Sequence, residues 1–181
     1  CNEYYKYLFS VYSSFYSKID INDINTLIQS IKTIDILNCK SLMVREYNLS
    51  KPTIKQHKNS FLNIKEIFHP LIEKLETNEM YVKNNISLGK DENGILLFGT
   101  NAVGKTSLIK SIGIAVLMAQ CGLYVPCSSM EYYPYEYIFT RIIGNDNIFK
   151  GLSTFAVEMS ELRVILKYCN KNSLILGDEL C

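Results

Sequence analysis

The sequence lacks a net charge and a long apolar run. Its 19 lysine and arginine residues nearly balance its 18 aspartate and glutamate residues, which gives a formal net charge of +1. This balance excludes a strongly basic nucleic-acid-binding arm and an acidic tail. The longest apolar run, 112–119, is interrupted by Gly113 and is too short to span a bilayer. No secretory signal is visible, so we expect an intracellular protein that does not associate with membranes.

The sequence also lacks the cysteine spacing of a zinc or redox site. None of the six cysteines forms a Cys-x-x-Cys pair, and neither histidine, His57 or His69, lies near a cysteine pair. We therefore expect reduced thiols, mostly in the core, and two structural histidines. The 181 residues, 48% of them hydrophobic, suffice for one domain with a sizeable core, or for one domain plus part of another.

The first 50 residues predict long helices. Residues 3–19 carry many aromatic side chains without strand alternation, and residues 22–46 predict a second helix. In the second helix an apolar residue recurs every three or four positions, at Ile24, Leu27, Ile28, Ile31 and Ile34. Asn22 or Asp20 is placed to cap its start. The segment 48–52, Asn-Leu-Ser-Lys-Pro, breaks the pattern, so we expect a helical domain at 1–50 and a second domain at 51–181.

Beyond residue 50 the pattern alternates between strands and helices. Strands are predicted at 61–68, 95–98, 137–143 and 173–176, and helices at 104–120 and 154–168. The run 95–98, Ile-Leu-Leu-Phe, is wholly apolar, which suits a buried parallel strand. This alternation predicts an α/β fold with a mostly parallel sheet flanked by helices.

A phosphate-binding pattern joins the predicted strand 95–98 to the helix after it. The segment 99–106, Gly-Thr-Asn-Ala-Val-Gly-Lys-Thr, fits G-x-x-x-x-G-K-[ST] at every fixed position. Its glycines let backbone N–H groups converge on a phosphate, and the helix adds the positive end of its dipole. Lys105 would reach the β- and γ-phosphates of ATP, and the Thr106 hydroxyl would bind Mg²⁺. The alternative is a chance glycine-rich turn. The predicted ATP-binding residues of this loop are Gly99, Thr100, Asn101, Ala102, Val103, Gly104, Lys105, Thr106 and Ser107.

Two acidic residues follow the predicted strand 173–176. In a P-loop fold this strand lies beside the strand that leads into the phosphate loop. Asp178 would then face the Mg²⁺ ion through water, and Glu179 would orient or deprotonate the attacking water. The alternative is an exposed acidic turn. We take Glu179 and Lys105 as candidate catalytic residues, and Thr106 and Asp178 as candidate Mg²⁺ ligands.

The stretch between these two motifs is distinctive. Residues 139–146 read Phe-Thr-Arg-Ile-Ile-Gly-Asn-Asp, and residues 151–159 read Gly-Leu-Ser-Thr-Phe-Ala-Val-Glu-Met. They resemble the F-T-R-I-G-x-x-D and S-T-F-x-x-E-M segments of the MutS mismatch-repair ATPases. The phosphate loop, the segment 120–126 and the pair His69-Pro70 also resemble MutS segments, so the likeness runs from about residue 20 to the end. The ending, 177–181, resembles the MutS branch of giant DNA viruses and octocoral mitochondria.

The resemblance implies a fold and further site residues. It implies part of an ABC-type P-loop ATPase domain, ending after the second acidic motif, preceded at 1–50 by the end of a helical lever. It also implies a homodimer in which Ser153 and Thr154 approach the partner's nucleotide, and a Tyr81 ring stacked on the adenine. From the residues alone, Ser153 equally caps its own helix. The alternative for Tyr81 is a tyrosine packed in a core or on a surface.

The resemblance also includes Gln120 and Asp146. Gln120 would sense Mg²⁺ or the attacking water, and Asp146 would lie near the subunit junction. Arg141 is expected to form an ion pair at a sheet edge or an interface rather than to act in catalysis.

The resemblance implies an ATP- and Mg²⁺-dependent DNA mismatch repair protein. Mismatched double-stranded DNA would bind to domains outside these 181 residues, and the lever would couple this DNA binding to the binding and hydrolysis of ATP. A virus-infected cytoplasm or a mitochondrion is the implied location. The 181-residue stretch alone is expected not to hydrolyse ATP. One alternative is a transporter or chromosome-organising ABC ATPase, although Leu152-Ser-Thr-Phe lacks the glycine pair of L-S-G-G. The other is a nucleotide-gated DNA clamp with little turnover.

Overall fold

The computed structural model describes residues 2–18, 20–75, 81–100, 103–142 and 154–178, with the backbone alone at 154 and 155. The chain divides into two units, Cys1–Leu42 and Met43–Cys181. The phosphate loop and the acidic motif both belong to the second unit.

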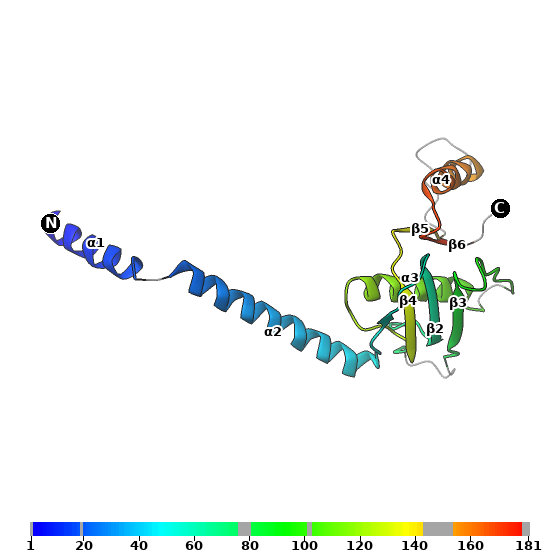
Figure 1. The fold of residues 1–181 in the computed structure, drawn as a ribbon, viewed down its shortest axis with the longest axis horizontal. Helices are drawn as coiled ribbons and strands as arrows, with labels where there is room; N and C mark the ends of the chain where they lie inside the picture. The colour runs from blue at the N-terminus through cyan, green and yellow to red at the C-terminus, as the bar shows by residue number, and fades with distance from the viewer. Residues whose placement is uncertain (1, 19, 76–80, 101–102, 143–153, 179–181) are drawn as a thin grey trace. The chain divides into compact units, whose positions relative to one another are not determined.

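Helices α1 (Asn2–Tyr16) and α2 (Ile21–Tyr47) confirm the two helices predicted near the N-terminus (Figure 1). The backbone N–H of Asn22 donates to Oδ1 of Asp20 at 2.8 Å, so Asp20 caps α2. Neither helix has a buried residue, and the apolar repeat of α2 stays exposed, from Ile24 to Ile34. Among the described residues, no helix is long and apolar enough to cross a membrane.

A four-stranded sheet is made by β1 (Thr53–Ile54), β2 (Phe61–Ile67), β3 (Asn84–Leu88) and β4 (Ser129–Tyr133). Its order is β1-β4-β2-β3, and β2 runs antiparallel to both of its neighbours. The predicted strand at 61–68 is confirmed, but the expectation of a mostly parallel sheet is wrong for this sheet. Apolar alternation marks which face of a strand is buried, and it does not encode the direction of the neighbouring strand.

A second sheet pairs β5 (Tyr137–Arg141) with β6 (Ser173–Gly177). The pairing is parallel, with Arg141 opposite Gly177 at the end of the ladder. Helix α4 (Thr154–Tyr168) lies between these strands in the sequence, as a parallel connection requires. Both strands and the helix were predicted, and the parallel expectation holds for this pair.

Helix α3 (Lys105–Gln120) packs against both sheets (Figure 1). Its buried face joins one apolar cluster with Leu62 and Ile64 of β2 and with Leu174 and Leu176 of β6. Burial of each such side chain contributes about 1.5–3 kcal/mol. Gly113 allows close packing, since a Cβ atom there would lie 3.0 Å from Cδ1 of Leu176. The cluster therefore fixes the helix that follows the phosphate loop against the strand that precedes the acidic motif.

The expected buried strand at 95–98 is wrong. These residues belong to no strand, and β6 pairs with β5 rather than with them. Leu96 is 88% exposed and Phe98 is 91% exposed, whereas Leu97 packs against the core. Ile95 is also exposed, at 41%, so Leu97 alone of these four residues packs inward. An apolar run needs a partner strand on its edge to become a buried strand, and a composition-based prediction cannot supply that partner.

Candidate functional site

The phosphate loop closes around the side chain of Lys105. Its Nζ donates to the carbonyl oxygen of Gly99 at 2.7 Å and to that of Thr100 at 2.9 Å. An ammonium group has three N–H donors, so these two contacts leave one for a further acceptor. Lys105 is the first residue of α3, where free backbone N–H groups favour an anion. The loop therefore gathers a cation and helix N–H groups at one place.

Gly104 makes the turn from the loop into the helix. It is the N-cap of α3 and has a φ of 94°, in the left-handed region. A side chain with a Cβ atom costs roughly 1–2 kcal/mol in that conformation. The backbone conformation therefore favours glycine at the second fixed position of the motif.

Thr106 and Asp178, the two candidate Mg²⁺ ligands, meet directly. The hydroxyl Oγ1 of Thr106 donates to Oδ2 of Asp178 at 2.6 Å. The first turn of α3 supplies one partner, and the residue after β6 supplies the other. Asp178 is only 4% exposed, and its N–H donates to the carbonyl oxygen of Arg141 at 2.7 Å. Mg²⁺ prefers oxygen ligands and commonly takes one or two from a protein, with phosphates and waters supplying the rest. A hydroxyl beside a carboxylate fits that requirement.

Arg141 confirms the expectation of an ion-pair residue. Its Nε lies 2.8 Å from Oε2 of Glu161 on α4. This nitrogen is buried and has no hydrogen-bond partner among the described residues, so the contact is an ion pair. The sequence did not reveal that the backbone of the same residue holds Asp178. That link depends on the register of β5 and β6, which no local pattern encodes.

Gln120 lies at the far end of α3 from Thr106. The two residues are fourteen positions apart along the helix, or about 21 Å. Its side chain donates to the carbonyl oxygen of Tyr135 at 3.1 Å and accepts from the N–H of Tyr135 at 2.8 Å. The hypothesis that Gln120 senses Mg²⁺ is therefore wrong: its amide holds the connection between β4 and β5.

His69 has a structural role, as expected. Its Nδ1 accepts from the backbone N–H groups of Leu71 and Ile72 at 3.3 and 3.4 Å. Burial, and then the positive charge of Lys110, lower the pKa of the imidazole below its ordinary value. The neutral form that Nδ1 needs as an acceptor is thereby favoured. The backbone N–H of His69 in turn donates to the hydroxyl of Tyr81 at 3.1 Å, which ties the candidate adenine-stacking residue to this loop.

The remaining predicted site residues are described in part or not at all. Val103 is 60% exposed, and the carbonyl oxygen of Ser107 accepts from the hydroxyl of Ser111 within α3. Thr154 is the first residue of α4 and is described by its backbone alone. The residues outside the described part of the chain are Asn101, Ala102, Asp146, Ser153 and Glu179.

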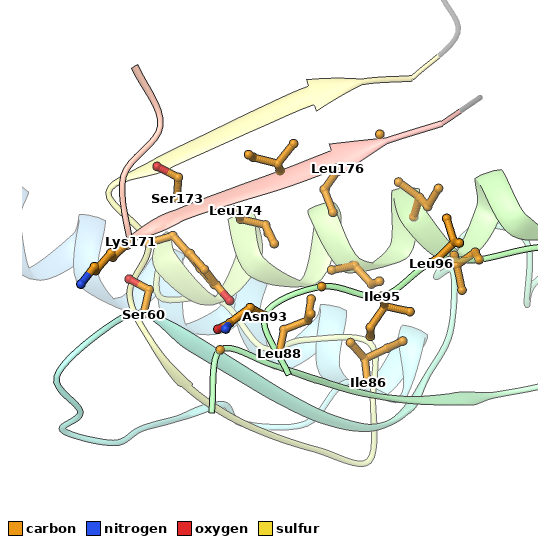
Figure 2. Close-up of a pocket in the computed structure, with 18 of the residues that line it drawn as sticks. Ser60, Ile86, Leu88, Asn93, Ile95, Leu96, Lys171, Ser173, Leu174 and Leu176 are labelled. Atoms are coloured by element: carbon orange, nitrogen blue, oxygen red, sulfur yellow. The ribbon is translucent and has the colours of Figure 1, made fainter. Parts of the chain in front are cut away.

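A cavity of about 970 Å³ adjoins the site. Leu174 and Leu176 project into it from β6, and Leu88 and Ile95 line the opposite side (Figure 2). Lys105 and Asp178 also line it, so the apolar cavity continues to the polar site. Residues 93–97 also line it.

Residues 95–181 match the family model for MutS domain V. The chain is 38% identical to the mitochondrial DNA mismatch repair protein mutS homolog of Sarcophyton glaucum, over 86% of the chain and 16% of that relative. It is also 38% identical to a putative DNA mismatch repair protein mutS homolog of Acanthamoeba polyphaga mimivirus, over 83% of the chain and 17% of that relative.

The chain belongs to the MutS family.

The yeast DNA mismatch repair protein MSH6 is likewise 38% identical, over 88% of this MutS-family chain and 13% of that protein. The chain therefore spans less than a fifth of the length of each of these relatives. The phosphate loop, α3 and Asp178 all lie inside the segment that matches MutS domain V, whereas Tyr81 lies before it. The resemblance to the viral and octocoral sequences agrees with two of these relatives.

Proposed function

We propose that this MutS-family chain binds Mg²⁺·ATP at the loop Gly99–Ser107 and hydrolyses it within a longer DNA mismatch repair protein. The observation that carries the proposal is the 2.6 Å contact between Thr106 and Asp178. Two oxygen atoms of the kind that Mg²⁺ prefers lie beside the phosphate loop. The lysine of this loop and the backbone N–H groups of the helix favour the binding of phosphates. The fold that we propose for the whole domain is the ABC-type P-loop ATPase.

Each residue has a distinct part in the proposed site. Lys105 holds the β- and γ-phosphates with its remaining N–H donor, or with a donor that leaves the carbonyl oxygen of Gly99 or Thr100. Thr106 and Asp178 hold Mg²⁺, which supplies positive charge next to those phosphates. Glu179, directly after Asp178 in the sequence, orients or deprotonates the attacking water. Tyr81 stacks on the adenine, and Ser153 and Thr154 approach the nucleotide of a second subunit.

The segment Ile95–Phe98 has a place in this proposed fold. Leu96 and Phe98 are almost fully exposed, while a cavity lined by Leu174 and Leu176 lies beside the same segment. We propose that the segment enters this cavity as a third strand along the free edge of β6. Entry would bury the two exposed side chains, and each burial would contribute about 1.5–3 kcal/mol of stabilising free energy. Slower amide exchange at 95–98 in the presence of Mg²⁺·ATP would support this step, and unchanged exchange would contradict it.

The longer protein is proposed to couple ATP to mismatched DNA. Mismatched double-stranded DNA binds through domains outside this chain, and two ATPase domains associate as a homodimer. The relatives are DNA mismatch repair proteins by name, which supports the repair role, and two of them support a mitochondrial or viral setting. Such coupling requires that DNA binding and nucleotide binding favour the same conformational state.

Nucleotide binding by the chain tests the proposed site. A fluorescent ATP analogue should bind in the presence of Mg²⁺, and Lys105→Ala should weaken binding at least tenfold, because the phosphates lose their cation. Lys58→Ala is the matched control, since Lys58 is exposed and lies outside the loop. Equal affinity of Lys105→Ala and the unaltered chain would refute the assignment. That the chain alone lacks steady-state turnover stays a prediction, which the same preparation tests.

A nucleotide-gated DNA clamp with little turnover is distinguished by kinetics in a longer MutS-family protein that contains these residues. Single-turnover hydrolysis there should slow in Glu179→Gln if hydrolysis is part of the function. If Glu179→Gln loses hydrolysis but the longer protein still supports mismatch repair fully, the DNA clamp is favoured instead.

A further inference from the structure

Arg141 contacts both the candidate Mg²⁺ ligand Asp178 and helix α4. Its carbonyl oxygen accepts the N–H of Asp178 at 2.7 Å, and its Nε lies 2.8 Å from Oε2 of Glu161. The side chain of Arg141 is 15% exposed, and that of Glu161 is 49% exposed. One residue at the end of β5 therefore joins the end of β6 to α4.

These contacts form a continuous path from α3 to α4. Thr106 donates to the carboxylate of Asp178, Asp178 donates to the backbone of Arg141, and Arg141 pairs with Glu161. The three distances are 2.6, 2.7 and 2.8 Å, so none of the steps leaves room for a water. Contiguous contacts of this kind carry coupling between two sites when both sites bias the same element.

We propose that Arg141 is a positioning residue that couples Mg²⁺·nucleotide binding at Thr106 and Asp178 to helix α4. The inference rests on the proposed function of that site. A cation that shares the oxygens of Thr106 and Asp178 changes the spacing of this pair, and the N–H bond passes the change to the end of β5. The guanidinium is always charged and nearly buried, so it keeps Glu161 with it when it moves.

The partial burial of this pair makes it a better link than a surface ion pair. Fully exposed pairs are screened by water and salt and contribute little. Here the arginine is held inside while the glutamate reaches it from the surface of α4. Under the proposed function α4 begins at Thr154, which approaches the nucleotide of the second subunit. Through Arg141, nucleotide bound at Thr106 and Asp178 would then set the orientation of α4, the helix that approaches the nucleotide of the second subunit.

Coupling must be reciprocal. If Mg²⁺·ATP stabilises one orientation of α4, removal of the link weakens the binding of Mg²⁺·ATP by the same factor. A half-exposed ion pair supports a coupling of about two- to fivefold in affinity. The affinity for Mg²⁺·ATP and the amide exchange of α4 are therefore two independent measures of the same coupling free energy.

The principal test replaces Glu161 with Gln, because this side chain is half exposed and its loss should not prevent folding. In the unaltered chain, Mg²⁺·ATP should slow amide exchange along residues 156–168. In Glu161→Gln this response should disappear, and affinity for the fluorescent ATP analogue should fall about two- to fivefold. Glu131→Gln is the matched control: it makes the same charge change in an exposed pair, 3.7 Å from Lys55 on the other sheet. It should alter neither readout.

A charge exchange separates coupling from packing. Arg141→Glu with Glu161→Arg should restore much of the response of α4 that either single change removes. Arg141→Lys, which keeps the charge in a smaller side chain, should retain part of it. If Glu161→Gln binds Mg²⁺·ATP as tightly as the unaltered chain and α4 still responds, the inference is overturned while the proposed site stands. If the unaltered chain does not bind Mg²⁺·ATP, the proposed function fails and the inference falls with it.

Discussion

The side-chain amide of Gln120 holds the backbone of Tyr135 at both of its polar groups, donating to the carbonyl oxygen and accepting from the N–H. This arrangement joins the end of α3 to the connection between β4 and β5. It gives a partner to both backbone polar groups of a residue that lies outside the strands.

Gln120→Ala should lower the free energy of unfolding by about 1–2 kcal/mol, because two hydrogen bonds are lost and the Tyr135 groups lose their partners. Urea denaturation measures this change. Gln29→Ala, in the exposed helix α2, serves as the control and should alter stability by less than about 0.5 kcal/mol. The Mg²⁺ dependence of nucleotide binding should be unchanged in Gln120→Ala. A lost Mg²⁺ dependence with normal stability would contradict the structural role.

Gly104→Ala should destabilise the chain by roughly 1–2 kcal/mol, because alanine pays the steric cost of the left-handed conformation at the N-cap of α3. The same urea measurement applies. Gly94→Ala is the comparison, since a Cβ atom at Gly94 meets nothing within 4 Å and its φ lies outside the left-handed region. Similar losses in the two variants would show that backbone conformation is not the cause.

His69 should make stability depend on pH. Its pKa in the folded chain lies below the ordinary value of 6.5, so the unfolded chain binds the proton more readily. The free energy of unfolding should therefore be at its full value above about pH 6.5 and should fall as the pH drops from there towards the folded-state pKa. Protonation would also place a hydrogen on Nδ1, where two N–H groups now donate. Denaturation at several pH values should show that His69→Asn flattens this slope, whereas the exposed His57→Asn keeps it.

Asp178→Asn should remove the Mg²⁺ dependence of nucleotide binding. Asparagine still accepts the hydrogen bond from Thr106 but lacks the negative charge that a divalent cation requires. Titration of the fluorescent ATP analogue with and without Mg²⁺ should show a difference of at least tenfold in the unaltered chain and almost none in the variant. Asp91→Asn, an exposed acid outside the site, should behave as the unaltered chain does. A variant that still responds fully to Mg²⁺ would exclude Asp178 as a ligand.

The elements around the site could be predicted where their patterns are local. The helix after Gly104 and the strand before Asp178 were both expected from short stretches of sequence, and both are present. Their meeting at Thr106 and Asp178 was expected from the spacing of a known motif, not from any pairing visible in the sequence.

The features that could not be predicted depend on distant partners. Residues 95–98 are as apolar as β6, yet only β6 has a paired strand, because a hydrogen-bonded neighbour and not composition decides the outcome. Strand β4 was not expected, since its burial depends on β2 lying beside it. The amide of Gln120 and the two contacts of Arg141 likewise reach partners outside their own elements.

The parallel pairing of β5 and β6 has a consequence for the order of folding. Tyr137 pairs with Ser173 across a long stretch of chain that includes α4. Such a non-local pairing is slow, because the entropy of closing the loop is lost before its contacts form. Helix α3 and the antiparallel pair β2–β3 are local and can form early. Asp178 reaches Thr106 only once β6 is in register, so the geometry suited to Mg²⁺ should mature last, and a refolding chain should regain helix before it regains affinity for nucleotide.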